Sequence, residues 1–127
     1  MDSEIKANEY VTEHFKFSEC RCPCCDMLKI IPGFFLHMEW LERMRQELGF
    51  AMVINSGYRC LSHNRAVNGR PKSWHLLFAT DVRAEDNDER KILLIYRKAL
   101  EMNWGGIGKH RTFVHLDLRP EEMRWRG

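Results

Sequence analysis

Apolar residues recur at helical spacing in two stretches of the chain. Over residues 34–48 they return every three or four positions, and Gly49 follows as a typical C-terminal cap. The second stretch, residues 92–99, comes after an aspartate-rich run at 86–88 whose side chains can cap a helix. The spacing therefore predicts two amphipathic helices, the first over 34–48 and the second from that run to just before Asn103.

Three shorter runs with alternating or β-branched residues predict strands. They cover residues 51–55, 78–83 and 112–118. Residues 61–68 predict one or two helical turns, residues 1–33 an irregular entry, and the glycines at 105, 106 and 108 a flexible turn. Helix, strand, strand, helix and strand in one short chain predict an α+β fold with a small, mostly antiparallel sheet flanked by helices.

Length and composition place the chain among globular proteins with one core. It has 127 residues, 44% of them hydrophobic, and no repeat or linker divides it, so we expect one domain over residues 1–127. The net charge of +2 and the alternating signs of charge give no reason to expect a nucleic-acid partner. No apolar run reaches the ~18 residues of a membrane span, and the polar start of the chain does not resemble a signal peptide.

Polar residues gather where the predicted elements end, and three of them have the chemistry of metal ligands. His75 precedes the second predicted strand, Asp81 lies within it, and His115 lies in the third. Two imidazoles and one carboxylate from separate elements suit a catalytic zinc, which takes three protein ligands and keeps one position for water. Because the chain has six histidines, a chance approach of histidine to carboxylate is the alternative at this point.

Several motifs, taken in their order, resemble those of a known enzyme family. They are Ser56-Gly57-Tyr58-Arg59, His63-Asn64, Asn68-Gly69, Ser73-Trp74-His75, Ala79-Thr80-Asp81 and Phe113-Val114-His115-Leu116-Asp117. Together, over residues 10–125, they are similar to the zinc D-Ala-D-Ala peptidases of bacterial cell walls, peptidase family M15. The closest likeness is to the small carboxypeptidases and murein endopeptidases, which include phage endolysins. The resemblance implies the zinc D-Ala-D-Ala peptidase or hedgehog-like fold, with Zn²⁺ held by His75, Asp81 and His115.

The sequence departs from that family at two points. The family motif S-x-H-x-x-G-x-A-x-D has six residues between His and Asp, whereas five separate His75 from Asp81, and the glycine is missing. We expect Asp81 to keep its strand position while the shorter connection takes another route. Related enzymes also carry an acidic residue or a histidine shortly before the last zinc histidine, where this chain has Thr112 and Phe113.

The other candidate residues are assigned by chemistry and by the resemblance. Asp117 follows His115 by two residues, on the same side of an extended strand, so we expect it to act as the catalytic general base, with a role in holding the imidazole of His115 as the alternative. The guanidinium of Arg59 suits a scissile carbonyl or a substrate carboxylate, with a structural salt bridge as the alternative. Further substrate contacts are expected from Ser73, Tyr58 and His63. For Tyr58, a place in the core is the alternative.

Four of the five cysteines crowd together at positions 20, 22, 24 and 25, and Cys60 lies far downstream. Such clustering predicts a local metal site or a local disulfide, and not a framework of disulfides spread through the fold. Cys20, Cys22, Cys25 and Cys60 can supply the four ligands of a structural zinc, and a disulfide from Cys60 to the cluster is the alternative.

These observations predict a zinc-dependent peptidase that hydrolyses amide bonds of peptidoglycan stem peptides, with no nucleic-acid or membrane partner and a monomer favoured. The two departures motivate an alternative, a catalytically degenerate, zinc-containing cell-wall-binding or structural module. Kinship with zinc-bearing signalling domains is a third hypothesis, based on fold analogy. We expect cytoplasmic synthesis with action at the cell wall, as for an endolysin, or a secreted protein trimmed of its leader.

Overall fold

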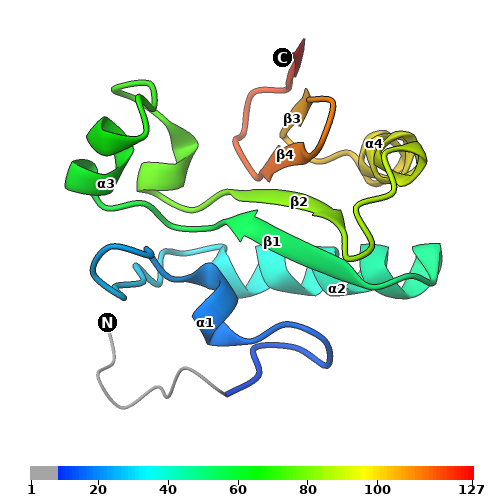
Figure 1. Ribbon diagram of the computed structural model, residues 1–127, viewed down its shortest axis with the longest axis horizontal. Helices are drawn as coiled ribbons and strands as arrows, with labels where there is room; N and C mark the ends of the chain where they lie inside the picture. The colour runs from blue at the N-terminus through cyan, green and yellow to red at the C-terminus, as the bar shows by residue number, and fades with distance from the viewer. Residues whose placement is uncertain (1–8) are drawn as a thin grey trace.

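A five-stranded sheet organises residues 9–127, the part of the chain that the computed structural model describes (Figure 1). The strands are β1 (Met52–Ser56), β2 (Thr80–Ala84), β3 (Gly106–Lys109), β4 (Val114–Asp117) and β5 (Met123–Arg126). Their order across the sheet is β1-β2-β4-β3-β5. Every neighbouring pair is antiparallel except β3 and β5, which run parallel.

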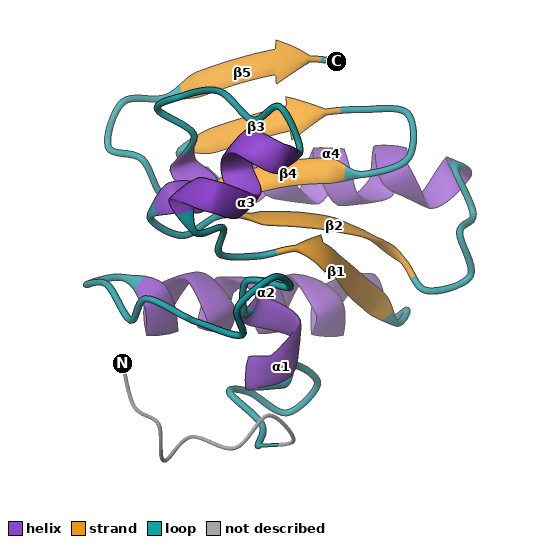
Figure 2. Cartoon of the chain, turned by 60° about the vertical axis from the view of Figure 1, so that its left-hand side comes forward, coloured by secondary structure: helices purple, strands orange, loops and turns teal. Residues whose placement is uncertain are grey.

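Helices cover the two faces of the sheet unequally (Figure 2). The two long helices, α2 (Phe34–Leu48) and α4 (Arg90–Met102), contribute their apolar faces to the same core as the sheet. The short α3 (Leu61–Ala66) lies in front of the sheet in Figure 2, on the side away from α4. A single turn of 3-10 helix, η1 (Trp74–Leu76), follows α3, and α1 (Phe17–Cys20) packs near β1. Among residues 9–127, no helix combines the length and the apolar composition needed to cross a membrane.

The predicted α+β fold with a mostly antiparallel sheet is confirmed. The first long helix has the predicted bounds, and the second begins at Arg90 because the aspartate-rich run forms a turn before it. The three predicted strands are all present, displaced or shortened by one or two residues. Residues 61–68 do contain a short helix. Residues 1–8 of the predicted irregular entry lie outside the described residues.

The flexible turn predicted at the glycines 105, 106 and 108 is wrong, because Gly106 begins strand β3. Gly106 pairs with Asp117 of β4 and Gly108 pairs with His115. A Cβ atom on Gly106 would overlap the Asp117 carboxylate, and one on Gly108 would overlap the indole of Trp125. These glycines therefore leave room for side chains that their strand neighbours place over them, which the sequence pattern alone does not reveal.

Glu42 ties the N-terminal segment to helix α2. Its carboxylate accepts hydrogen bonds from the Thr12 hydroxyl (2.8 Å), from the His14 backbone N–H (2.7 Å) and from the His14 ring (2.6 Å). Burial acts to raise the pKa of Glu42, but the hydrogen bonds from His14, Thr12 and Gln46 outweigh it and lower that pKa to about 2. The ionised form is therefore the one that the fold stabilises.

We expect the substitution Glu42→Gln to lower the free energy of unfolding near neutral pH by about 1–3 kcal/mol, because it removes a charge-assisted network. Since the folded pKa lies below that of the unfolded chain, the contribution of Glu42 is present above pH ~4.3 and is lost as the pH falls toward 2. Urea unfolding between pH 2 and 7 measures both effects. Glu39→Gln, at an exposed position of the same helix, is the control and should change little.

Candidate metal centre and active site

Strands β2 and β4 bring Asp81 and His115 face to face. The two residues are Cα partners in the antiparallel ladder. Their neighbours Val82, Val114 and Leu116 are fully buried in the core, and side chains alternate along a strand, so Asp81 and His115 lie on the opposite face. Both are nevertheless largely buried, at 7% and 8% exposure.

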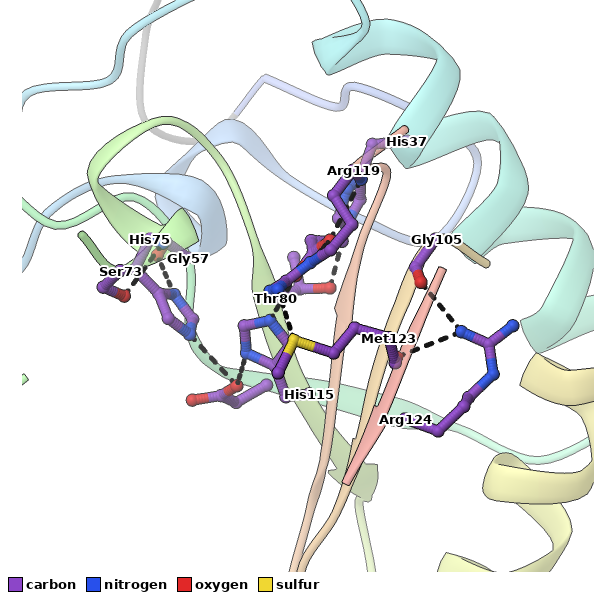
Figure 3. Close-up of polar contacts among 12 residues, drawn as sticks. His37, Gly57, Ser73, His75, Thr80, Gly105, His115, Arg119, Met123 and Arg124 are labelled. Atoms are coloured by element: carbon purple, nitrogen blue, oxygen red, sulfur yellow. Dashed lines mark hydrogen bonds and ion pairs between the residues drawn. The ribbon is translucent and has the colours of Figure 1, made fainter. Parts of the chain in front are cut away.

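His75 reaches the same point from the 3-10 turn η1. The Ser73 hydroxyl accepts a hydrogen bond from the His75 backbone N–H (3.1 Å) and so begins this turn. The ring is fixed at its other end, where Nδ1 lies 2.7 Å from the carbonyl oxygen of Gly57. Figure 3 shows the imidazoles of His75 and His115 pointing toward each other, and their centroids are 5.0 Å apart.

Three potential ligand atoms converge here. His75 Nε2 and His115 Nδ1 each lie 3.1 Å from Oδ1 of Asp81. A carbonyl oxygen can only accept a hydrogen bond, so the proton of the His75 ring sits on Nδ1 and the lone pair of the neutral imidazole sits on Nε2. His115 Nε2 donates in the same way to Asp117, 2.7 Å away, which leaves its lone pair on Nδ1. Two nitrogen lone pairs and one carboxylate oxygen within 4.8 Å of one another fit a zinc ion.

The short connection between His75 and Asp81 does not prevent this convergence. The η1 turn winds the chain immediately after Ser73, and residues 77–79 then lead directly into β2. Phe78 is 2% exposed and belongs to the core cluster, so it anchors the connection. Asp81 thus keeps the strand position that the sequence predicted for it.

Asp117 is completely buried, and two partners bind its carboxylate. Oδ2 accepts from His115 Nε2 and from Nη2 of Arg119 (2.6 Å). Oδ1 accepts from the backbone N–H of Arg119 (3.0 Å) and from its Nε (2.8 Å). The guanidinium carbon of Arg119 in turn lies 5.4 Å from the ring centre of Trp74 and 5.2 Å from that of Trp125.

Sequence reasoning missed Arg119, although the spacing Asp117-x-Arg119 offered a signal for it. In an extended chain, residues two apart lie on the same side, so an arginine at this offset can form the fork-like pair seen here. Burial acts to raise the pKa of Asp117, but the hydrogen bonds from Arg119 and His115 outweigh it and hold that pKa below the usual range.

At Asp81 and His115, as at Asp117, contacts with polar partners outweigh the effect of burial on the pKa. Burial acts to raise the pKa of Asp81, but the close contacts with His115 and His75, which donate to the carboxylate when these rings are protonated, dominate and lower it well below its usual range. For His115, burial acts to lower the pKa, and the bonds to Asp117 and Asp81 outweigh this effect and raise it. Both carboxylates are therefore ionised.

Arg59 lies at the edge of this cluster. Its Nη2 is 3.6 Å from Oδ2 of Asp81, its Nε is 3.3 Å from the Ser56 hydroxyl, and its Nη1 is 3.4 Å from Oδ1 of Asn64. The backbone N–H of Arg59 donates to the carbonyl oxygen of His75 (2.8 Å). Asn64, which sequence reasoning named only within a motif, is buried and also donates to the Arg70 carbonyl oxygen (3.0 Å).

The structure places the remaining predicted substrate residues as follows. The Ser73 hydroxyl caps η1. Tyr58 is half-buried and packs against the core cluster, in agreement with the alternative that placed it in the core. His63 is half-buried on α3, where its backbone N–H donates to Sγ of Cys60 (3.3 Å). A substrate contact by any of these three stays a prediction.

Comparison with known proteins agrees with this geometry. Residues 13–117 match the family model described as Peptidase M15. The chain belongs to the peptidase M15 family. The match spans all three converging residues of this M15 chain and ends at Asp117. No curated protein and no solved structure matches the chain significantly. Membership of M15 places the chain among the metallopeptidases, which in this family are generally zinc-dependent.

If these three residues hold a metal, His115→Ala should reduce the zinc content by one ion per chain, because it removes one of three ligand atoms. Native mass spectrometry of the zinc-loaded chain counts the ions. His110→Ala is the matched control, since His110 stacks on Phe113 outside this group and should leave the count unchanged. An unchanged count in His115→Ala would contradict the assignment.

Proposed function

We propose that this M15 chain is a zinc peptidase that hydrolyses amide bonds in the peptide stems of bacterial peptidoglycan, as a D-Ala-D-Ala carboxypeptidase or a murein endopeptidase. One observation carries the proposal. The lone pairs of His75 Nε2 and His115 Nδ1 converge on the Asp81 carboxylate, and each imidazole is locked in the required tautomer by an acceptor behind it. Such acceptors orient metal-binding histidines and raise their basicity.

In this proposal His75, Asp81 and His115 hold Zn²⁺. When bound, zinc supplies Lewis-acid chemistry, because it acidifies water and polarises a carbonyl group. The low exposure of all three residues favours this use, since electrostatic interactions are stronger where water is excluded.

Arg59 is the residue that we assign to the substrate. A guanidinium offers five N–H donors, and three of its nitrogens here make only long contacts of 3.3, 3.4 and 3.6 Å. Its side chain is 17% exposed, so the remaining donors are available to a carbonyl oxygen or a carboxylate. Peptide stems end in carboxylates, and the fork of Arg59 is suited to binding one with two hydrogen bonds.

Asp117 acts in this proposal as a positioning residue for His115. A carboxylate has about four acceptor sites, and four donor atoms of His115 and Arg119 already occupy them. With its side chain at 0% exposure, Asp117 has no free lone pair for the proton of an attacking water. The role that the sequence predicted for Asp117, the general base, requires Arg119 to move away and stays a prediction.

The occupied acceptor sites of Asp117 favour a second candidate function. If no carboxylate near the three metal-binding residues is free to take a proton, the chain can be a catalytically degenerate, zinc-containing module that binds the cell wall. In both cases the substrate class is the same. Synthesis in the cytoplasm with action at the wall, as for an endolysin, and secretion with loss of a leader both fit this proposal.

Mass spectrometry of purified peptidoglycan and of defined stem peptides, incubated with zinc-loaded protein, separates the two candidates. The peptidase hypothesis expects products that are absent with His115→Ala, and their masses identify the bond that is cut. Binding of peptidoglycan without any product, by both the wild-type chain and His110→Ala, would favour the degenerate module. Neither product nor binding would refute both.

Asp117→Asn tests the positioning role. The amide places donors where His115 and Arg119 also donate, so we expect zinc affinity to fall by about 10–100-fold and the lost rate to return in part at saturating zinc. Zinc titration and turnover of the same samples measure the two effects. Asp86→Asn, at an exposed loop position, is the control. A collapse of the rate with unchanged zinc affinity would instead identify Asp117 as the base.

A further inference from the structure

Four cysteines from two separate parts of the chain gather at one place. Cys22, Cys24 and Cys25 lie in the segment between α1 and α2, and Cys60 directly precedes α3. All four Sγ atoms lie within 4.8 Å of one another. Sγ of Cys24 is 3.5 Å from that of Cys22 and 3.2 Å from that of Cys60. All four are free thiols in this structure.

This spacing matches the requirement of one tetrahedral metal ion. With metal–sulfur bonds of about 2.3 Å, the sulfur atoms of a tetrahedron lie about 3.8 Å apart. The separations of 3.5 and 3.2 Å lie below that value and no pair exceeds 4.8 Å, so shifts of up to about 1 Å suffice to form the tetrahedron. Four soft thiolate ligands in this geometry select zinc among the common divalent ions.

We propose that Cys22, Cys24, Cys25 and Cys60 bind one structural Zn²⁺ ion, separate from the site at His75, Asp81 and His115. On binding, four Zn–S bonds form and the four thiol protons pass to solvent, so no oxidant or reductant takes part. With four protein ligands the coordination shell is closed, as in structural and not catalytic zinc sites.

The backbone around the cluster is arranged to support thiolates. The Cys60 N–H donates to Sγ of Cys22 (3.4 Å), and the His63 N–H at the start of α3 donates to Sγ of Cys60 (3.3 Å). Such donors stabilise the negative charge of coordinated sulfur. The structure also corrects the expected ligand set, because Cys24 takes the place of Cys20. Cys20 is fully buried, and its Sγ contacts Lys16 O and Met38 Sδ instead.

The position of the cluster gives the ion a role in the fold. The segment from residue 21 to residue 33 contains no helix or strand, and Cys24 and Cys25 are exposed. Leu28 anchors the later part of this segment in the core, but residues 23–27 are all exposed, and a metal ion would stabilise this exposed part in place of apolar contacts. The chain next to the cluster, residues 57–60, supplies the Gly57 carbonyl to His75 and contains Arg59. Zinc bound at the cluster therefore restrains residues 57–60, which support one side of the proposed active site.

Metal analysis combined with X-ray absorption of the zinc-loaded, reduced chain tests the proposal. We expect two zinc ions per chain and a shell of sulfur at about 2.3 Å. In His115→Ala one ion should be lost while the sulfur shell stays, so failure of this proposal is distinct from failure of the proposed function. Cobalt added to the metal-free wild-type chain should give thiolate-to-metal charge-transfer absorption in the near ultraviolet.

Two variants define the ligands. Cys24→Ala should lose one ion and weaken the sulfur signal, whereas Cys20→Ala, the matched control, should keep both. Should Cys24→Ala fail to fold, the sulfur shell and the cobalt spectrum of the wild-type chain still decide the question. Absence of sulfur around zinc in the wild-type chain, a Cys24–Cys60 disulfide in the zinc-loaded protein, or iron in place of zinc after expression in zinc-replete medium would each overturn the proposal.

Discussion

The antiparallel register between β2 and β4 is the constraint on which the candidate active site depends. It makes Asp81 and His115 direct partners, and the alternation of side chains then fixes Asp117 on the same face. A slip of β4 by one residue would turn His115 toward the core and Val114 and Leu116 toward the opposite face. Because Val82, Val114 and Leu116 are each fully buried, the hydrophobic core itself enforces the register that the metal site needs.

The buried side chains of Thr80 on one face of β2 and of Asp81 on the other have polar partners, which limits the cost of placing charge in the interior. On the core side, His37 lies 2.9 Å from the Thr80 hydroxyl, and burial lowers its pKa to about 3, so it is neutral and adds no charge. On the other face a chain of contacts runs from Asp81 through His115 and Asp117 to Arg119. Removing any member would leave a buried partner without its bond, which costs far more than the pair contributes.

Sequence reasoning found the elements whose signal is local. The helix at 34–48 shows its periodicity and its glycine cap, and the candidate ligands His75, Asp81 and His115, which the structure brings together, lie in strands or beside them with typical donor chemistry. It missed β3, since glycine in a strand resembles a turn until the side chain opposite is known. It also missed β5, which has only four residues and pairs in parallel with β3. It placed Cys20 in the thiol cluster because spacing along a chain does not say which sulfur faces inward. Arg119 was missed for a similar reason, since its role exists only once Asp117 is buried.

Different interactions hold the two halves of the candidate active site in place. Asp81 and His115 sit on strands whose position follows from packing in the core. His75 and Arg59 come from an irregular stretch that the sheet does not hold, and hydrogen bonds to Gly57, Ser73 and Asn64 tie it together. Hydrogen bonds near a surface stabilise only modestly, about 0.5–1.5 kcal/mol each, so this half needs a further restraint to keep a ligand within a few tenths of an ångström. The backbone bond from Tyr58 to Cys20 and the cysteine cluster beyond it lie where such a restraint acts. In a domain of this size, an ion bound by the cysteine cluster would supply stability that a larger domain obtains from an additional layer of hydrophobic packing.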